Sequence, residues 1–336
     1  MSQDKQSSAS AGSRLRLRGH LTQYLSFSAI VVLLVGLSLT QQNFLGRMNM
    51  SNLFRDTAPL MIMAAGMTSV LLLGSIDLST GAMCSVSNVL FVRFLSEVGV
   101  NMPIGLATIS AFALSLGFGL VAGFLMGYVH VKLKVPSFIA SLGFMSVWQS
   151  AALLISERSS PVPKAVWGAI DWYKVSFGVV GLPLIIALVL VVLVYVFQAR
   201  TTIGKNIYAI GGNERAARIA GVPVDRTKIT VFVVNGFCAA LGGIFLAAKL
   251  RSGAPTIGDA FTLMVIASCV LGGTALSGGR GSVLGTIIGV FTVALINNGM
   301  NFIGVSAYWQ NVVFGLFVLG AIAISVDRSV RDLAIK

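Results

Sequence analysis

Charged side chains are scarce in this sequence, and long apolar runs take their place. Only 10% of the 336 residues are Asp, Glu, Lys or Arg, 56% are hydrophobic, and the mean hydropathy is +0.88. A water-soluble domain cannot cover its surface with so few charges, so the composition predicts a chain built into a lipid bilayer. The net charge is +13, but the basic residues lie between apolar runs and form no basic patch, so no nucleic-acid partner is expected.

Cysteine and histidine are also rare, which limits the chemistry open to the chain. The three cysteines lie in apolar runs without CxxC spacing and the two histidines are isolated, so neither a disulfide framework nor a metal site is expected. No phosphate loop of the form GxxxxGKS or GxxxxGKT, no HExxH motif and no nucleophile elbow occurs. These absences predict a protein that is not an enzyme, has no ATPase site and holds no cofactor of its own.

Apolar runs of about 20 residues, each long enough to cross a bilayer as a helix, repeat along the chain. About ten are predicted, some short or interrupted, so we expect an all-α integral membrane protein. Residues 1–24 are expected to form a disordered tail, residues 25–325 one membrane domain and residues 326–336 a second tail. The predicted spans are 25–42, 54–73, 80–96, 104–127, 137–155, 177–197, 229–248, 260–275, 283–299 and 309–325.

The distribution of Lys and Arg orients these spans. Loops that stay in the cytoplasm carry an excess of basic residues, and ten spans place both chain ends on one side. In that arrangement 16 of the 24 Lys and Arg fall on the side of the two ends, and the remaining 8 fall on the other. The two-to-one excess predicts that the N and C termini are cytoplasmic, together with the basic segment 200–228.

The segment 200–228 contains a short predicted helix. Asn213 is a natural N-cap, Glu214 suits the positive end of the helix dipole, and Gly221, followed by a proline two residues later, ends the helix after two turns. Glu214 and Arg218 are spaced for an i,i+4 ion pair. The pattern favours a docking surface for a partner protein, although an ordinary basic cytoplasmic loop would also contain such charges.

A polar interruption separates the second and third predicted spans, in the segment LLLGSIDLSTGA, residues 71–82. Asp77 stands there at a depth where an unpaired carboxylate is costly. Two compatible alternatives are open. In the first, Asp77 and Ser79 cap the following helix, so that the carboxylate accepts backbone N–H groups. In the second, the interrupted helix lines a transport path, and Asp77 accepts hydrogen bonds from a polar solute.

A second interruption, VLGGTALSGGRGSVLGT at residues 270–286, has six glycines, which allow tight turns and close approach of helices. Its weak likeness to residues 71–82 suggests an internal repeat. Because both loops fall on the same side of the predicted topology, these two segments are not expected to be related by an inverted repeat.

The polar side chains within the predicted spans are mostly neutral, and Asp77 is the only acid expected at depth. An ion-coupled carrier usually has several ionisable groups there. Amides, hydroxyls and aromatic rings suit a path for a neutral, hydroxyl-rich solute, whereas hydrogen bonding between helices is the competing explanation for each amide. The candidate residues for the path are Asp77, Ser79, Asn88, Phe144, Trp148, Asn235, Asn297 and Asn298.

Three strings, GMTSVLLLGSIDLSTGA, AIGGNERAARIAGVPVDRTKI and VLGGTALSGGRGSVLGTIIG, resemble in order and spacing the membrane-spanning permease subunits of bacterial ABC importers for monosaccharides. The resemblance covers residues 45–325. It implies a permease of the bacterial inner membrane that pairs with a second copy or a sister permease and receives a pentose or hexose from a periplasmic sugar-binding protein. It also implies cytoplasmic ABC ATPase subunits, which bind ATP and Mg and drive alternating access.

The same resemblance implies that the short helix is the coupling element, which inserts into a cleft of the ATPase. The chain departs from the family at Thr262 and Met264, where relatives commonly carry carboxylates, so no carboxylate function is carried over to that span. Two other functions stay open: import of a furanose of the autoinducer-2 type, and ion-coupled sugar transport by a secondary carrier. The predicted coupling residues are Gly211, Gly212, Asn213, Glu214, Arg215, Ala216, Ala217, Arg218 and Gly221.

Overall fold

The structure, a computed structural model, describes residues 41–306 without a gap, together with residues 28, 31–32, 34–39, 308–310, 312–313, 315–316 and 320. The described part is mostly helical, as predicted, and each of its four strands has two residues. Six of its helices are long and apolar enough to cross a membrane. The predicted spans 25–42 and 309–325 lie largely outside the described residues.

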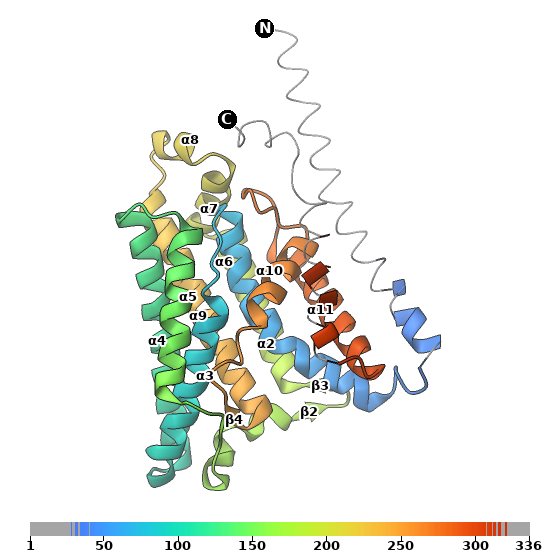
Figure 1. The fold of residues 1–336 in the computed structure, drawn as a ribbon. Helices are drawn as coiled ribbons and strands as arrows, with labels where there is room; N and C mark the ends of the chain where they lie inside the picture. The colour runs from blue at the N-terminus through green and yellow to red at the C-terminus, as the bar shows by residue number, and fades with distance from the viewer. Residues whose placement is uncertain are drawn as a thin grey trace.

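The elements follow one another as a series of helices with short connections (Figure 1). The strands and short 3-10 helices fall between α5 and α6, except for η1 before α4 and β4 after α9. In chain order the elements are α2 (Arg47–Leu72), α3 (Thr80–Glu97), η1 (Gly99–Asn101), α4 (Ile104–Lys132), α5 (Ser137–Ile155), β1 (Ser160–Pro161), η2 (Lys164–Ala169), η3 (Asp171–Lys174), β2 (Ser176–Phe177), β3 (Val180–Gly181), α6 (Leu182–Arg200), α7 (Thr202–Gly212), α8 (Glu214–Ile219), α9 (Val224–Leu250), β4 (Ser252–Gly253), α10 (Phe261–Leu271) and α11 (Val283–Phe302).

The long helices α2 and α9 contribute more residues to the main buried core than any other two elements. Every residue of α2 from Thr57 to Leu72 is buried. A Cβ added to Gly66 of α2 would lie 2.7 Å from the Cβ of Cys238 on α9. The two helices are therefore so close at Gly66 that a larger side chain would clash. Because protein encloses α2, this helix needs no lipid-facing side chains, which explains its many Ala, Met, Ser and Thr residues.

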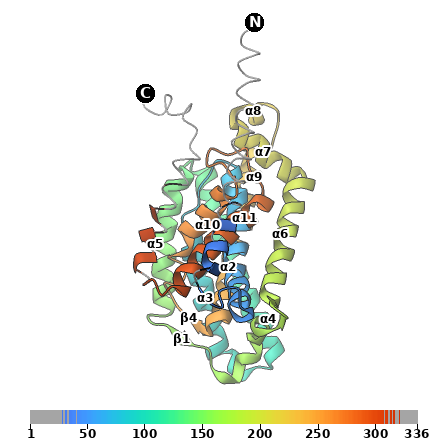
Figure 2. The ribbon, with the colours of Figure 1, turned by 90° about the vertical axis from the view of Figure 1, so that its right-hand side faces the viewer.

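The helices α4, α5 and α6 form much of the outer surface of the bundle, and α5 and α6 lie at opposite edges of it (Figure 2). Large apolar side chains are exposed on all three helices. On α6, Val189, Val192 and Leu193 expose more than half of their surface. An apolar surface of this extent is stable only against lipid or another membrane protein, in agreement with the composition.

A stripe of glycines joins α4 to α9. Gly119, Gly123 and Gly127 follow one another at every fourth position of α4, so they share one face of the helix. A Cβ on Gly123 would lie 2.3 Å from the carbonyl oxygen of Phe232, and one on Gly119 would lie 2.5 Å from that of Gly236. The two backbones therefore pack directly on each other, which is the known use of small residues at four-residue spacing in membrane helices.

Two of the spans, α3 and α10, begin within the bundle after an irregular segment of chain (Figure 1). Their first turns meet, because the Gly81 N–H donates to Oγ1 of Thr262 at 3.1 Å and the Gly258 N–H donates to Oγ of Ser85 at 2.9 Å. The predicted topology treats residues 249–259 as a loop between two spans, whereas in the structure the end of this segment packs against the first turns of α3. Hydropathy marks where α10 begins but does not reveal that the polar chain before it also enters the bundle.

The loops gather at two opposite ends of the bundle (Figure 1). One end carries α7, α8 and the loops 133–136 and 272–282, and we call it the α8 end. At the other, the hairpin end, β1 pairs with β4 and β2 pairs with β3. This is the grouping that the predicted topology requires of these loops. The side of the membrane that each end faces stays a prediction.

Candidate functional site

The basic segment 200–228 folds into two consecutive helices and the start of a third, where the sequence predicts one short helix. The additional helix, α7, begins at the N-cap Thr201, whose hydroxyl accepts the N–H of Gly204 at 3.0 Å. Asn213 separates α7 from α8. Helix α9 then begins at Val224, five residues before the predicted span.

The capping predicted for α8 is confirmed at both ends. The Oδ1 atom of Asn213 accepts the N–H of Ala216 at 2.9 Å. Gly221 has a φ of +80°, its N–H donates to the carbonyl of Arg218, and the next N–H, that of Val222, donates to the carbonyl of Ala217 at 3.0 Å. These bonds make a Schellman motif, which needs a glycine in the left-handed conformation. The six residues of α8 are thus held as a helix by their own ends.

Helix α8 stands at the tip of its end of the molecule and exposes nearly all of its surface (Figure 1). Only Ala217 is buried, and it packs into the main core. Ile219, a large apolar residue, exposes 81% of its surface. An exposed apolar side chain beside Arg215 gives α8 the mixed surface that a protein partner can cover.

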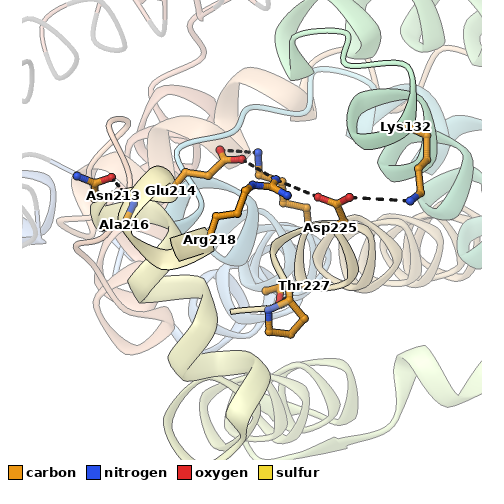
Figure 3. A network of polar contacts seen from close by, with 9 residues as sticks. Lys132, Asn213, Glu214, Ala216, Arg218, Asp225 and Thr227 are labelled. Atoms are coloured by element: carbon orange, nitrogen blue, oxygen red, sulfur yellow. Dashed lines mark hydrogen bonds and ion pairs between the residues drawn. The ribbon is translucent and has the colours of Figure 1, made fainter. Parts of the chain in front are cut away.

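A chain of four ion pairs runs from α8 through the start of α9 to the end of α4, and two of these pairs join α8 directly to α9 (Figure 3). The predicted pair between Glu214 and Arg218 forms at 3.4 Å. The sequence analysis missed the other three: Glu214 with Lys228 at 2.8 Å, Arg218 with Asp225 at 3.0 Å, and Lys132 with Asp225 at 3.9 Å. Asp225 and Lys228 lie in the first two turns of α9. A prediction that begins this helix directly after Pro223 identifies them as partners. We call Lys132, Glu214, Arg218, Asp225 and Lys228 the charge clamp.

The charge clamp shifts the pKa of its members. Partial burial raises the pKa of Glu214, but the hydrogen bond and charge of Lys228, together with those of Arg218, outweigh burial and hold that pKa below its usual value. The hydrogen bond from Arg218 to Asp225 in turn raises the pKa of the guanidinium. Both shifts favour the charged forms of Glu214 and Arg218.

The C-terminal end of α7 packs on backbone from both polar interruptions. A Cβ on Gly211 would lie 1.8 Å from the carbonyl oxygen of Leu72 and 2.4 Å from the nitrogen of Gly279. The Gly279 N–H donates to that same Leu72 carbonyl at 2.8 Å. Tyr208 adds a bond from its hydroxyl to the Gly281 carbonyl at 3.1 Å. We call Leu72, Tyr208, Gly211, Gly279 and Gly281 the glycine junction; it joins three segments that are far apart in the sequence.

Asp77, Ser79 and Asn235 form one fully buried polar cluster with Thr80. The Asp77 carboxylate accepts the N–H of Ser79 at 2.9 Å and its hydroxyl at 2.6 Å through Oδ1, and the amide of Asn235 at 3.0 Å through Oδ2. The Asn235 amide also donates to Oγ1 of Thr80 at 2.9 Å. The expected cap by the Ser79 side chain is wrong, because its hydroxyl bonds to Asp77 and not to the helix. The carboxylate nevertheless accepts a backbone N–H, as the structural alternative requires.

The other candidate path residues do not join this cluster. Asn88 bridges α3 to the carbonyl of Gly243 at 3.1 Å and to the N–H of Ala254 at 2.7 Å. Phe144 and Trp148 stack on each other on α5, with ring centroids 5.7 Å apart. On α11, Asn298 exchanges hydrogen bonds with Asn49, and Asn297 donates to the sulfur of Met264. Their role in a path stays a prediction.

Within the part of the chain that the structure describes, no three His, Cys, Asp or Glu side chains gather in a way that could hold a metal ion. The three cysteines of the sequence are all buried and unpaired with one another. Asp259, which is not among the predicted candidate residues, lies beside the meeting point of α3 and α10. One signal could have marked it: Asp259 precedes Thr262 by three residues, as Asp77 precedes Thr80.

Comparison with known proteins adds a family and several relatives. The family described as "Branched-chain amino acid transport system / permease component" matches residues 49–322. The chain is 35% identical to the ribose import permease protein RbsC of Bacillus subtilis over 316 residues, which cover 94% of this chain and 95% of that protein. It is 35% identical to RbsC of Escherichia coli K12 over 324 residues, covering 95% and 97%. It is 31% identical to the xylose transport system permease protein XylH of the same organism over 364 residues, covering 90% and 91%. No solved structure matches the chain.

Proposed function

Because the chain belongs to the branched-chain amino acid transport system / permease component family, we propose that it is the membrane-spanning subunit of an ABC importer for a monosaccharide, a pentose or hexose. Relatives that cover nearly the whole chain are named as ribose and xylose permeases, which supports a sugar as the cargo. They lend no support to import of an autoinducer-2-type furanose or to an ion-coupled carrier. The chain is a multi-pass protein of the bacterial inner membrane.

The chain performs no covalent chemistry in this proposal. A periplasmic sugar-binding protein delivers the sugar, a second copy or a sister permease completes the path, and a cytoplasmic ABC ATPase binds ATP and Mg. ATP binding must favour one membrane conformation by about 5 kcal/mol to shift the population nearly completely. That free energy has to reach the spans through a contact surface, for which α8 is the best candidate.

The observation that carries the proposal is the connection of α8 to the rest of the bundle. Its exposed tip offers the ATPase Arg215 and Ile219, the charge clamp connects it to α9 and α4, and α7 connects it to the glycine junction. A displacement of α8 would therefore act on the start of α9, on the end of α2 and on the loop before α11. We infer that residues 200–228 are the coupling segment.

The proposal includes a topology. Ten spans with both termini in the cytoplasm would turn the α8 end toward the ATPase and the hairpin end toward the sugar-binding protein. The path would run along the helices that carry Asp77, Asn88, Phe144, Trp148, Asn235 and the asparagines of α11. Because Asp77, Asn88 and Asn235 are buried within this conformation, the broken start of α3 would have to move to expose them.

Reconstitution tests the proposal directly. Proteoliposomes containing this chain, its ATPase and its sugar-binding protein should take up D-ribose or D-xylose only when ATP is supplied on the ATPase side. A thiol at the exposed position 219 (Ile219→Cys) should react with a membrane-impermeant maleimide from that side, and the ATPase should protect it. Labelling only from the opposite side, or uptake without the ATPase, would contradict the proposal.

A further inference from the structure

The segment between α9 and α10 brings a carboxylate into the bundle. Residues 254–260 run from the hairpin end to the first turn of α10. Gly258 is bonded to Ser85 of α3, and Thr262 is bonded to Gly81. Asp259 stands between these two contacts in the sequence, so it lies beside the first turns of both broken helices.

Contacts with α9 give the depth of this point. Thr80, the first residue of α3, accepts a hydrogen bond from Asn235. Asn235 is about 17 Å from Val224 and about 22 Å from Leu250 along α9, at a rise of 1.5 Å per residue. The start of α3, and with it Asp259, therefore lies near the middle of a helix that extends from one end of the bundle to the other. An ionised carboxylate at mid-depth is not stable against lipid.

Asp259 is nevertheless exposed on the surface of the chain. Its Oδ1 atom accepts a hydrogen bond from Nε2 of Gln149 on α5 at 3.1 Å. Ser146 and Ser150 lie one turn apart on α5 and are both exposed, and Gln149 follows Ser146 by three residues. The contrast with α6, whose exposed middle is entirely Val and Leu, distinguishes this polar face from a lipid-facing one. An exposed acid that is paired with an amide at mid-depth fits a water-lined surface and not a lipid-facing one.

We propose that Asp259 and Gln149 form a binding site for the hydroxyl groups of the sugar, on the wall of the translocation path. This inference rests on the proposed function. A carboxylate accepts hydrogen bonds from two neighbouring hydroxyls, and an amide both donates and accepts, so the pair matches a neutral polyol. The stacked rings of Phe144 and Trp148 lie on the adjoining side of the same helix and add apolar surface next to the site.

Water access is tested first, with a thiol in place of Ser150. The three native cysteines are buried, so they give little background. Only a hydrated thiol forms the thiolate that reacts with a charged methanethiosulfonate. In the reconstituted complex, Ser150→Cys should react at least about tenfold faster than Leu193→Cys, a lipid-facing control on α6. Loaded sugar-binding protein with ATP should slow the reaction. Equal rates for the two thiols would overturn the proposal.

Sugar contact is tested by uptake of D-ribose or D-xylose, whichever the wild-type complex transports. Losing a charge-assisted hydrogen bond should make uptake by Asp259→Asn slower by about tenfold. Gln149→Leu should also slow uptake, and Asp259→Glu, which keeps the carboxylate, should restore part of it. The matched control is Glu97→Gln, because Glu97 is an exposed acid at the hairpin end of α3 that pairs with Arg93.

The outcomes separate this inference from the function on which it rests. Wild-type complexes that take up neither sugar with ATP would contradict the proposed function, while the reaction of the thiol at position 150 would still report whether the face is hydrated. Wild-type uptake by Asp259→Asn, in complexes that co-purify with the ATPase, would overturn the sugar site alone. If Asp259→Asn does not assemble with the ATPase, the labelling of Ser150→Cys is the deciding measurement. Slower labelling with loaded sugar-binding protein and ATP supports the sugar site, and an unchanged rate overturns it.

Discussion

At the scale of single residues, Asn235 connects the broken start of α3 to the central helix α9. Its amide satisfies both Asp77 and Thr80 in a region without solvent access. Asn235→Leu would leave a buried carboxylate oxygen without a donor, so we expect the free energy of unfolding to fall by about 2–4 kcal/mol. Thermal unfolding of the purified protein in detergent, followed by tryptophan fluorescence, measures this loss.

The matched control for that substitution is Asn298→Leu. Asn298 also bonds across two helices, but its partner Asn49 is a neutral amide and both are only partly buried. A neutral hydrogen bond contributes about 1 kcal/mol, so the control should lose less stability. Equal losses for the two variants would mean that the charge of Asp77 does not depend on Asn235.

Glu214 predicts a pH dependence for the tip of the molecule. Its pKa in the folded protein is below the usual 4.5, so the ion pairs with Lys228 and Arg218 stabilise α8 fully above the unfolded pKa and are lost as pH falls through the folded one. A spin label on Ile219→Cys should therefore stay immobile from pH 7 to about 5 and become mobile at lower pH. In Glu214→Gln the label should be equally mobile across this range; a persisting transition would assign it to another group.

At the scale of elements, α8 combines a docking surface with the charge clamp. Arg218→Glu would place a negative charge against Glu214 and Asp225, so we expect the clamp to open and the affinity for the ATPase to fall by about tenfold. Membrane insertion should be unchanged, because the segment lies outside the spans. Affinity is measured by binding of the purified ATPase to the chain in nanodiscs.

A charge exchange separates the two roles of Arg218. The double variant Arg218→Glu with Asp225→Arg restores an ion pair between α8 and α9 but reverses the charge that α8 shows to a partner. Recovery of ATPase binding would indicate that the clamp is what matters, whereas continued weakness would indicate direct contact with the ATPase. Full sugar-stimulated ATP turnover by the single variant would contradict both roles.

The glycine junction gives a prediction whose control is the same substitution at the adjacent residue. Gly211→Ala would put a methyl group 1.8 Å from the Leu72 carbonyl, so α7 must shift, at a cost of about 1–3 kcal/mol. We expect sugar uptake per ATP hydrolysed to fall. At the adjacent Gly212 a Cβ meets nothing within 4 Å, so Gly212→Ala should couple normally. The ratio of sugar uptake to ATP turnover in proteoliposomes compares the two variants.

Sequence patterns predicted those elements whose signals are local. The caps of α8, its i,i+4 ion pair and the positions of α4, α5 and α6 depend on neighbouring residues, and all are present as expected. The entry of residues 254–260 into the bundle depends on contacts of Gly258 with α3, about 175 residues away in the chain, and no period or propensity encodes such contacts. The spacing of Gly119, Gly123 and Gly127 was available as a signal for the α4 and α9 contact.

The candidate site residues also separate into those with a local sequence signal and those whose contacts depend on the fold. The nine predicted coupling residues all fall within residues 211–221, so one local motif was enough to propose them, and their role stays a prediction. The eight path residues were chosen by chemistry alone, and the fold brings only Asp77, Ser79 and Asn235 together. The clamp partners Asp225 and Lys132 come from other helices, and identifying them requires the relative position of those helices.

At the scale of the whole molecule, two helices of the bundle, α3 and α10, begin at mid-depth and run in opposite directions. From their meeting point, α3 runs toward the hairpin end and α10 toward the α8 end (Figure 1). An acidic residue precedes each of these two helices, and hydrogen bonds link their starts. The two short helices therefore meet at mid-depth, while α9 passes the same level as one continuous helix.

This arrangement predicts how the chain behaves without its partners. The first turns of the two short helices are held together by hydrogen bonds and close glycine contacts. We expect the purified chain alone, in proteoliposomes, to retain trapped D-ribose as well as empty lipid vesicles do. Leakage above that background, measured as loss of labelled sugar over time, would indicate an open channel.

The single buried side chain of α8, Ala217, has an evolutionary consequence. A helix attached through one small residue and a few surface charges can change most of its sequence without repacking the membrane domain. If the tip binds the ATPase as proposed, substitutions there would change which ATPase is recognised and would leave the helices of the bundle intact. The energy source and the cargo of related transporters would then vary independently.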